Sequence, residues 1–437
     1  MNRKEIFVVF ACLFFFDSAK ATEFKESVSR CGVKFLFIND NNSSLVHVKI
    51  VFKNAGAACR EKNKSGLPLF YSSAVFCGAG DYSRAQFSEA CSGLAAKISC
   101  SADADNLYFS FAVPTTVLKE AVALFNAAIK SPNFEEDKVK QIQNNIASYV
   151  QNYSANPREI AFSSIIPSII FKSHKYESGE CGSPEDLMKL SVEDLKNYKS
   201  KFLVTANAEA CVCGNISEAE AIALVDQIFS GVEVGEPAAD DVENVTPKLN
   251  SEMKKYYSEG PQSSVFFVLK TEHPLSPKRY AASLLYGILG ESHTFKARIL
   301  SKLRTENGLI YSGGVSTVDL KHANCVFGAL KTDNSKVQSA VNLLKVIIKD
   351  FRENGITESE LQFIKNNIKG SALVGLRTSG ALCNFYFNRR LLGLGETTLE
   401  ETMKKIDDVS LAEVNALAAE ILDENNMSFI VIGGGEK

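Results

Sequence analysis

The sequence predicts an α+β protein built from two homologous α/β domains that form a clamshell around a central cleft. The chain has 437 residues, more than one ordinary hydrophobic core needs, so two domains of roughly 200 residues each are expected. Short motifs recur at an offset of about 219 residues, which indicates an internal duplication. Strand-like stretches adjoin other strands as well as helices, which favours an antiparallel-rich sheet covered by helices in each half.

The duplication is visible in short stretches of sequence. The letters IQNNI at residues 142–146 recur as IKNNI at residues 364–368, and SVEDL at 191–195 recurs as SLAEV at 410–414. The two copies that begin at residues 142 and 364 are 222 residues apart, three more than the 219 residues between the copies that begin at 191 and 410. We place the extra residues in a loop at 351–357, because insertions in surface loops cost little free energy.

The elements of the first half follow from hydrophobic periodicity and from turn and capping residues. Alternating or apolar stretches predict strands, amphipathic stretches predict helices, and a capping box at Ser191 and Asp194 predicts a further helix start. The expected order is a strand at 33–38, a turn at 39–42, a strand at 45–52, a helix at 66–77, a strand at 107–113 and helices at 115–130 and 135–150.

A linker divides the two halves at residues 233–252. This segment contains Pro237, Pro247 and five acidic residues between positions 233 and 243, and it has little apolar periodicity. The first domain is therefore expected over residues 22–232 and the second over residues 253–437.

The N-terminus predicts a secretory signal over residues 1–21. Basic residues precede an apolar run at 6–16, and small residues at 19–21 provide a cleavage site. Eleven apolar residues are too few to span a bilayer, so no transmembrane segment is expected in the mature chain. We expect export, to a bacterial periplasm.

Composition excludes one class of partner and leaves another question open. The net charge is −3 and no basic patch is present, so nucleic acid is not an expected partner. Ten cysteines remain after the signal, and their spacings match no compact disulfide framework. Cys211 and Cys213 should lie on one face of a buried strand, as core residues or, less simply, as a redox or metal pair. Cys91 and Cys100 are candidate disulfide partners.

One segment of the first half resembles the zinc-site segment of the insulinase/pitrilysin peptidases, the inverzincin family that includes the mitochondrial processing peptidase. Residues 55–61 read AGAACRE and residues 64–78 read KSGLPLFYSSAVFCG. The family segment reads Gly-(small)-Arg-x-Glu, Lys-Ser-Gly, His-x-x-Glu-His and Phe-x-Gly. Later landmarks agree over residues 30–435, namely HKY at 174–176, GSPEDL at 182–187 and LRTENGLIYS at 303–312.

The resemblance implies a zinc site, but this chain has none of its ligands. In the family, two histidines one helical turn apart and a later glutamate bind zinc, and the glutamate between the histidines activates water. The matching positions here are Leu69, Ser72, Ser73 and Tyr149. No Asp, Glu or His occurs between Glu61 and Asp81, or between Asp137 and Glu159, so a shifted alignment does not restore the site.

No other constellation replaces the zinc site. No two of the five histidines lie within a helical turn of each other, so we expect them at the surface or in the core: His47, His174, His273, His293 and His322. We therefore expect no bound metal and no peptidase centre in this chain.

The second half keeps a pair of residues that the family uses. The resemblance implies that Arg304 and Tyr311 face the zinc across the cavity and hold the peptide, where a guanidinium and a phenol stabilise a developing oxyanion. The alternative, that Arg304 caps a helix end and Tyr311 packs on a strand, stays open.

Two functional hypotheses follow from this asymmetry. In several family members one subunit carries the zinc motif and its homologue keeps the Arg/Tyr pair, so we expect a catalytically silent subunit of a heterodimeric zinc peptidase that acts on peptides. The zinc is then expected in the homologous partner. The other hypothesis is a structural or peptide-binding protein, similar to core subunits of respiratory complexes, in which the cleft holds extended peptide by strand addition.

Overall fold

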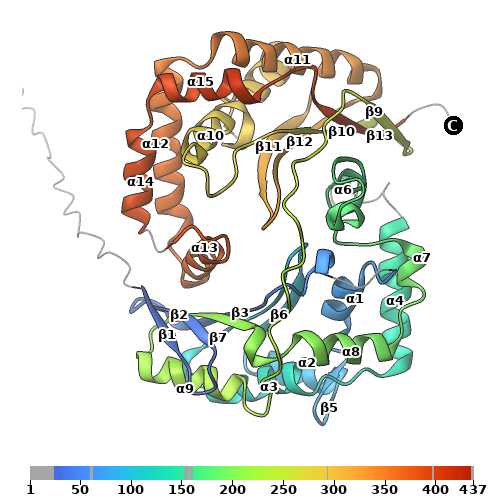
Figure 1. Ribbon diagram of the computed structural model, residues 1–437, viewed down its shortest axis with the longest axis vertical. Coiled ribbons are helices and arrows are strands. Elements are labelled where there is room, and N and C mark those ends of the chain that lie inside the picture. Colours follow the sequence, from blue (N-terminus) through green and yellow to red (C-terminus); the bar gives the residue numbers. More distant parts are fainter. Residues whose placement is uncertain are drawn as a thin grey trace, which may run out of the picture.

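The chain folds into two halves that lie one above the other, each with one sheet and its own helices (Figure 1). This computed structural model describes residues 24–59, 63–151, 157, 161–292, 294–395 and 398–434. The signal segment predicted at residues 1–21 lies outside these residues. The expected α+β class with two antiparallel-rich sheets is confirmed.

The first half has a six-stranded sheet in the order β1-β2-β8-β3-β7-β6. β2 and β8 run parallel, and all other neighbours run antiparallel. β3 occupies the predicted range and pairs with β7 from Leu45 opposite Pro114 to Phe52 opposite Leu107. The strands are β1 (Phe24–Val28), β2 (Lys34–Asn39), β3 (Leu45–Phe52), β6 (Lys97–Ala102), β7 (Leu107–Pro114) and β8 (Ala208–Gly214), with a separate hairpin of β4 (Gly78–Ala79) and β5 (Tyr82–Ser83).

Helices cover the outer face of this sheet and enclose the first core. Phe52, Phe109 and Phe125 are fully buried there, in contact with one another through ring edges. The helices are α1 (Leu67–Ala74), α2 (Arg84–Gly93), α3 (Leu118–Lys130), α4 (Glu136–Gln151), α6 (Ile166–Ile170), α7 (Pro184–Leu187), α8 (Val192–Phe202) and α9 (Glu218–Ile228), with short turns η1 (Ala57–Cys59), η2 (Thr115–Val117), η3 (Ala161–Ile165), η4 (Lys175–Ser178) and η5 (Thr205–Asn207). The predicted capping box at Ser191 and Asp194 begins α8.

The second half has a five-stranded sheet in the order β11-β12-β10-β13-β9. β13 and β9 run parallel and the other neighbours antiparallel, so the strand order and directions match those of β6-β7-β3-β8-β2. The strands are β9 (Met253–Tyr257), β10 (Gln262–Leu269), β11 (Ser312–Asp319), β12 (Asn324–Asp333) and β13 (Ser428–Gly433).

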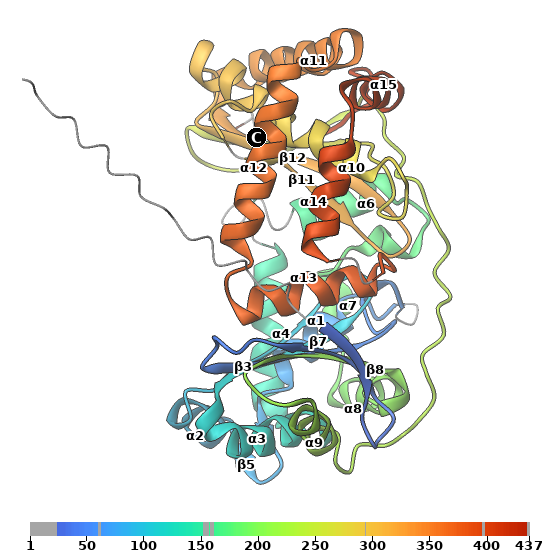
Figure 2. The ribbon, with the colours of Figure 1, turned by 90° about the vertical axis from the view of Figure 1, so that its left-hand side faces the viewer.

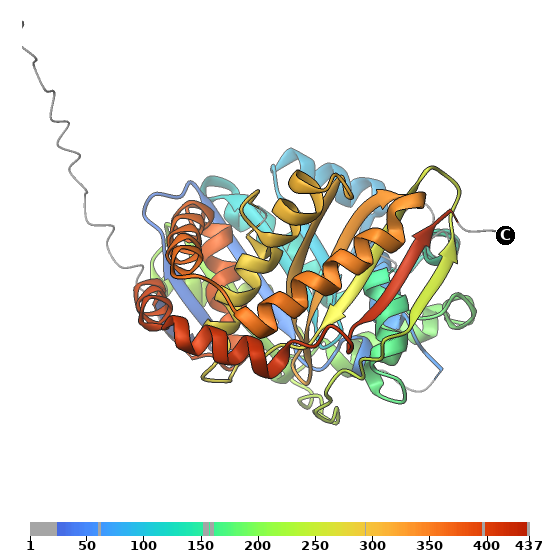
Figure 3. The ribbon, with the colours of Figure 1, turned by 90° about the horizontal axis from the view of Figure 1, so that it is seen from above.

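Helices α10, α11 and α15 cover the outer face of the second sheet, as Figure 3 shows from above. The loop predicted at residues 351–357 contains the turn between α11 and α12. The helical elements are α10 (Arg279–Tyr286), η6 (Gly287–Glu291), η7 (Ile299–Glu306), η8 (Asn334–Lys336), α11 (Val337–Asn354), α12 (Glu358–Gly375), α13 (Ser379–Leu391), α14 (Leu399–Asp408) and α15 (Leu411–Ile421).

Each half covers the inner face of the other half's sheet with one helical segment. α13 of the second half lies across the first sheet (Figure 2), where Phe387 and Cys383 pack with Cys211 and Cys213 of β8. The segment that contains α6 of the first half packs on the second sheet, against an apolar face that includes Phe266, Val268, Phe327, Ile430 and Ile432. The two segments fill much of the space between the sheets (Figure 1).

Pockets remain in the space between the halves. One pocket lined by both halves has a volume of about 580 Å³, and its walls include Lys49, Asp103 and Tyr108 from the first half and Asp319 and Lys321 from the second. Both halves therefore contribute walls to the space between them.

The linker at residues 233–252 contains no helix or strand and runs along the outside of the molecule (Figure 2). Its acidic residues pair with bases of both halves, Asp241 with Lys175 at 2.6 Å and Asp240 with Lys321 at 2.6 Å. The backbone N–H of Val245 also donates to the carbonyl of His322 at 2.9 Å. The linker thus follows a fixed path between the halves.

Two smaller expectations can be compared with the structure. All ten described cysteines are free thiols, so Cys91 and Cys100 form no disulfide here. Cys211 and Cys213 do lie on one buried face of β8, as the two-residue spacing predicts. Among the helices that the structure describes, none has both the length and the apolar character needed to cross a bilayer.

Candidate functional site

The positions that match the family's zinc ligands come together in one pocket. Leu69 and Ser73 lie one turn apart on α1, and Tyr149 lies near the end of α4. All three line a pocket of about 590 Å³. The ungapped spacing that selected Tyr149 in the sequence therefore corresponds to a shared site in space.

The start of α1 fixes this geometry. Gly66 precedes the helix with φ of +81°, a left-handed conformation that favours glycine. A Cβ at this position would approach the carbonyl oxygen of Cys181 to 2.7 Å, so only glycine fits. Pro68 then occupies the first turn, where its missing N–H costs nothing. α1 is held in this way against the loop that contains Cys181.

Ser72, at the position of the family's catalytic glutamate, does not line the pocket. It is buried, and its hydroxyl donates a hydrogen bond to the carbonyl oxygen of Leu69 at 2.9 Å. This local bond satisfies the hydroxyl, and a serine here has no carboxylate with which to activate a water molecule.

The side chains present do not fit a zinc ion. Zinc sites in proteins are built from imidazole, thiolate and carboxylate ligands, whereas these positions offer an alkyl chain, two aliphatic hydroxyls and a phenol. Over the described part of the chain, no group of three or more His, Cys, Asp or Glu residues could hold a metal ion. No hydrolytic step can be derived from this pocket.

Sequence reasoning missed Glu180 and Cys181, which line the same pocket. Burial, and to a smaller extent the nearby carboxylates of Asp103 and Asp105, raise the pKa of the Glu180 carboxyl to about 7. Glu180 follows Gly179 in an irregular loop, and nothing in its spacing relates it to α1 or α4. Only the path of this loop in the fold brings it to the pocket.

The retained pair lies elsewhere, on the exposed surface of the second half. Arg304 lies in the last turn of η7, with its guanidinium over the ring of Phe295 at 5.3 Å. Tyr311 precedes β11 and is 48% exposed, and its phenol donates to Asp333 at 2.5 Å. That hydrogen bond raises the pKa of Tyr311, which keeps the phenol protonated. Neither side chain is among the described residues that line the pocket at α1 and α4.

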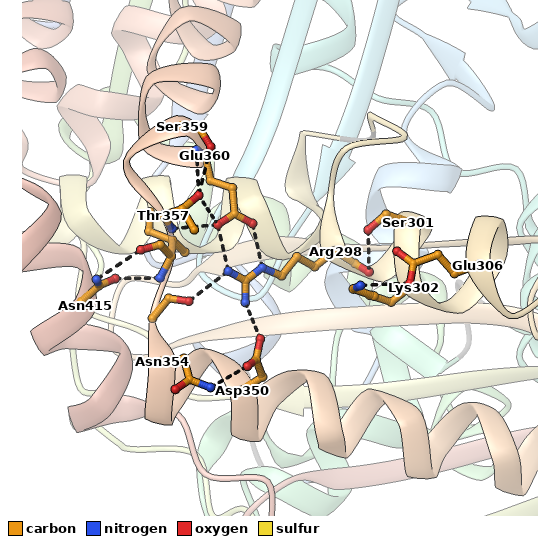
Figure 4. A network of polar contacts seen from close by, with 12 residues as sticks. Arg298, Ser301, Lys302, Glu306, Asp350, Asn354, Thr357, Ser359, Glu360 and Asn415 are labelled. Carbon is orange, nitrogen blue, oxygen red and sulfur yellow. Dashed lines mark hydrogen bonds and ion pairs between the residues drawn. The ribbon is translucent and has the colours of Figure 1, made fainter.

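A partly buried ion-pair network holds η7 in place (Figure 4). Arg298 stands at the start of η7 and donates from Nε and Nη2 to the two carboxylate oxygens of Glu360, each at 2.8 Å. Its Nη1 reaches Asp350 at 2.8 Å, and Nη2 also donates to the carbonyl of Gly355 at 3.0 Å. These bonds tie η7, and with it Arg304, to the turn between α11 and α12.

A groove beside Tyr311 runs over the inner face of β11, the edge strand of the second sheet. It has a volume of about 330 Å³ and small residues form its floor, among them Ser312, Gly313, Gly314 and Ser316. Phe327 lines the groove and contacts the ring of Phe162 edge-on at 5.1 Å, and Phe162 lines the pocket at α1 and α4. The groove and the pocket therefore lie on either side of one aromatic pair.

Three of the four described histidines, His174, His273 and His322, have hydrogen-bond partners. His322 lies between Asp240 and Asn244, and His174 contacts the carbonyl oxygen of Glu243, so both hold the linker. His273 accepts a hydrogen bond from the backbone of a nearby residue, and burial lowers the pKa of His47. His293 lies outside the described residues.

Comparison with known proteins gives matches along most of the chain. Residues 34–179 match the family described as Insulinase (Peptidase family M16), and residues 189–368 match the Peptidase M16 inactive domain. A protein of Helicobacter pylori named Non-peptidase homolog YmxG is 20% identical over 413 residues, which cover 94% of each chain.

Solved structures agree with these matches. The peptidase M16 inactive domain from Pseudomonas fluorescens superposes with a TM-score of 0.86 at 20% identity, covering 95% of this chain and 98% of that chain. A chain of complex III2 from Candida albicans superposes with a TM-score of 0.77 at 15% identity, covering 94% of this chain and 95% of that chain. At these identities the superpositions show the fold alone.

Proposed function

Because this chain belongs to the insulinase (M16) family of peptidases, we propose that it is the catalytically silent subunit of a heterodimeric zinc metallopeptidase. In this proposal a homologous partner bears the zinc, and this chain contributes Arg304 and Tyr311 to the partner's cavity. The complex acts on peptides, which are the substrates of the family.

One observation carries the proposal: Arg304 and Tyr311 do not line the pocket formed by the zinc-ligand positions. The pocket at α1 and α4 offers no ligand set for zinc, while Arg304 and Tyr311 remain on the exposed surface of the second half. A pair directed at solvent can reach the active site of another subunit. The name of the Helicobacter pylori relative, a non-peptidase homolog, supports the catalytic silence of this chain.

The two side chains would act as hydrogen-bond donors. The Arg304 guanidinium presents fixed N–H groups, and the protonated phenol of Tyr311 adds one O–H. Aimed at the carbonyl oxygen of the scissile peptide bond, they would stabilise negative charge as it develops there. Tyr311 would exchange its present acceptor, Asp333, for the substrate oxygen. The partner's zinc would supply the activated water.

Reconstitution tests this proposal. The purified chain should cleave no peptide alone, and it should raise cleavage when added to a homologue with an intact His-x-x-Glu-His motif. Arg304→Ala and Tyr311→Phe should each lower kcat of the complex by about 100-fold, in the range found for oxyanion donors.

Two variants serve as matched controls. Lys302→Ala removes an exposed cation from the same helix, and Tyr257→Phe removes an exposed phenol from β9. Both should leave kcat unchanged. If Arg304→Ala and Tyr311→Phe leave the reconstituted activity intact, the role of the pair is wrong.

The groove beside β11 favours a second candidate, a non-proteolytic structural or peptide-binding protein. An extended peptide could lie along this edge strand over the small residues of the floor, without any chemistry. The complex III2 chain supports this candidate, because it has the same fold within a respiratory assembly. A pull-down that recovers peptide but no homologous zinc subunit would favour it.

We also propose export to a bacterial periplasm, with removal of residues 1–21. The basic start, short apolar run and small residues near Ala21 support this proposal. Mass spectrometry of the mature protein should find Thr22 as its first residue, and an intact Met1 would contradict it.

A further inference from the structure

The pocket at α1 and α4 contains a carboxyl group for which the described part of the chain supplies no cationic partner. Glu180 lines the pocket of about 590 Å³ together with the apolar side chains of Leu69, Ile146 and Phe162. Its remaining walls carry hydroxyl, amide and thiol groups, from Ser73, Asn145, Tyr149, Ser163 and Cys181.

A largely buried carboxylate is normally paired, because the free energy of leaving an ion unpaired in a protein interior is high. Across the described residues, neither an ion pair nor a side-chain hydrogen bond engages the Glu180 carboxylate. The charged groups that act on it are Asp103 and Asp105, which are also acidic. Both of these carboxylates already accept hydrogen bonds, Asp103 from the backbone at Asn106 and Asp105 from Tyr176. Among the described residues that line this pocket there is no Lys, Arg or His to balance the charge of Glu180.

We propose that this pocket binds a primary ammonium group carried on an apolar chain, with Glu180 as its counter-ion. The ammonium supplies the missing positive charge and three N–H donors, which the carboxylate and the neighbouring hydroxyl and amide oxygens accept. Leu69, Ile146 and Phe162 cover the chain that carries it. The loss of the zinc ligands leaves room for this ligand at the same place.

The ammonium can come from two sources, the free amino terminus of a peptide or the end of a lysine side chain. Both present the same charge on a flexible stem, so the geometry of the pocket admits either. The proposal concerns this chain alone and does not depend on a zinc-bearing partner. It can therefore fail while the proposed function holds, and the reverse is also possible.

Three peptide probes separate the possibilities. The first is a pentapeptide of leucine, alanine and serine with a free amino terminus and an amidated carboxyl terminus. The second is the same peptide with an acetylated amino terminus, and the third is the acetylated peptide with one central lysine. Binding to the full-length mature chain is measured by titration calorimetry at about pH 7.5, where a peptide amino group is mostly protonated.

We expect the first or the third probe to bind about ten- to one-hundredfold more tightly than the second, as a charge-assisted hydrogen bond in a buried site predicts. Tighter binding of the first probe identifies an amino terminus as the ligand, and tighter binding of the third identifies a lysine. Equal affinity for all three probes, or no measurable binding of any, overturns the proposal.

Variants locate the binding in this pocket. Glu180→Gln keeps the shape of the side chain and should abolish the preference for the charged probe. Ser73→Leu, at an exposed position on the wall, should lower the affinity by filling the entrance. The control is Glu177→Gln, three residues away, whose carboxylate lines a neighbouring pocket and accepts from the Ser173 N–H at 2.8 Å. If Glu180→Gln binds the charged probe as tightly as the unaltered chain, the assignment of Glu180 is refuted.

Discussion

Arg298 provides the most direct test of how the second half holds η7. The replacement Arg298→Met keeps an unbranched apolar stem over the ring of Phe351, which the guanidinium now faces at 4.2 Å. It removes the paired hydrogen bonds to Glu360 and the bond to Asp350. The variant therefore isolates the ion pairs from most of the packing.

The size of the effect follows from the exposure of the three side chains. The Arg298 side chain is 13% exposed and that of Glu360 is 25% exposed, so this pair is largely removed from water. Loss of one partner from a buried pair destabilises a protein by about 3–5 kcal/mol, because the other charge stays buried. Glu360 keeps its hydrogen bonds at the start of α12, and Asp350 is 51% exposed, so we expect the lower end, about 3 kcal/mol.

Urea denaturation followed by circular dichroism measures this free energy of unfolding. The control, Lys302→Met, breaks an ion pair with Glu306 on the same helix in which both side chains are 49% exposed, and it should cost at most about 0.5 kcal/mol. The double variant Arg298→Met/Glu360→Gln should be more stable than Arg298→Met, because the only carboxylate left without Arg298 is then that of Asp350, which is 51% exposed. If Arg298→Met costs no more than Lys302→Met, the network does not hold η7 as described.

Acidification gives a second readout of the same pair. Glu360 is partly desolvated, which by itself opposes ionisation, but its bonds to Arg298 and Thr357 outweigh this and lower its pKa below the ordinary 4.5. A carboxyl whose pKa is lowered on folding stabilises the folded state at pH values above its unfolded-state pKa. This stabilisation is lost as the pH falls through the lower pKa of the folded state. The difference between the unaltered chain and Arg298→Met should therefore shrink in acid.

Two further predictions concern the contact between the halves and the pocket. Phe387→Ala should lower the free energy of unfolding by about 3–5 kcal/mol, because this fully buried ring of α13 packs on the first sheet. The control is Leu373→Ala on α12, where the side chain is 66% exposed. It should change the free energy of unfolding by less than about 0.5 kcal/mol in the same urea titration. Equal effects of the two variants would contradict the packing of α13. Because the pKa of Glu180 is raised, the folded state keeps a proton between pH 4.5 and about 7 that the unfolded state releases. The free energy of unfolding of the unaltered chain should therefore fall as the pH rises through this range. Glu180→Gln should remove this dependence of stability on pH, and above about pH 7 it should be up to about 3 kcal/mol more stable than the unaltered chain. If the variant keeps the same dependence on pH, Glu180 is not buried as described.

The sequence predicts the local helices and strands well, and also the pocket formed by the vacant zinc-ligand positions. Both depend on residues that lie close together in the sequence or on a few helices. The alternation in β3 and the capping box at Ser191 appear where periodicity and side-chain chemistry place them. The helical spacing of Leu69 and Ser73, with Tyr149 at the family distance, also predicts which side chains share a pocket. The sequence can therefore predict which residues lie close together when they share one helix or lie on two helices that pack against each other.

Contacts that depend on the packing of distant segments could not be predicted. Glu180 reaches the pocket through an irregular loop, and its charge environment comes from Asp103 and Asp105 on another turn. α13 is a short amphipathic helix of the second half, and its sequence does not say that its apolar face packs on the first sheet. Such contacts are determined only when both halves are assembled, which explains why the cleft is more filled than the duplication suggests.

The exchange of α6 and α13 between the halves has a consequence for how the chain can be divided. A gene fragment that encodes one half alone would leave the inner face of its sheet bare, with Phe266 and Phe327 exposed in one case and Val51 and Cys211 in the other. Such fragments would aggregate unless they were expressed together. A chain cut only in the linker should by contrast stay assembled, because α6 and α13 would still pack on the sheet of the other half.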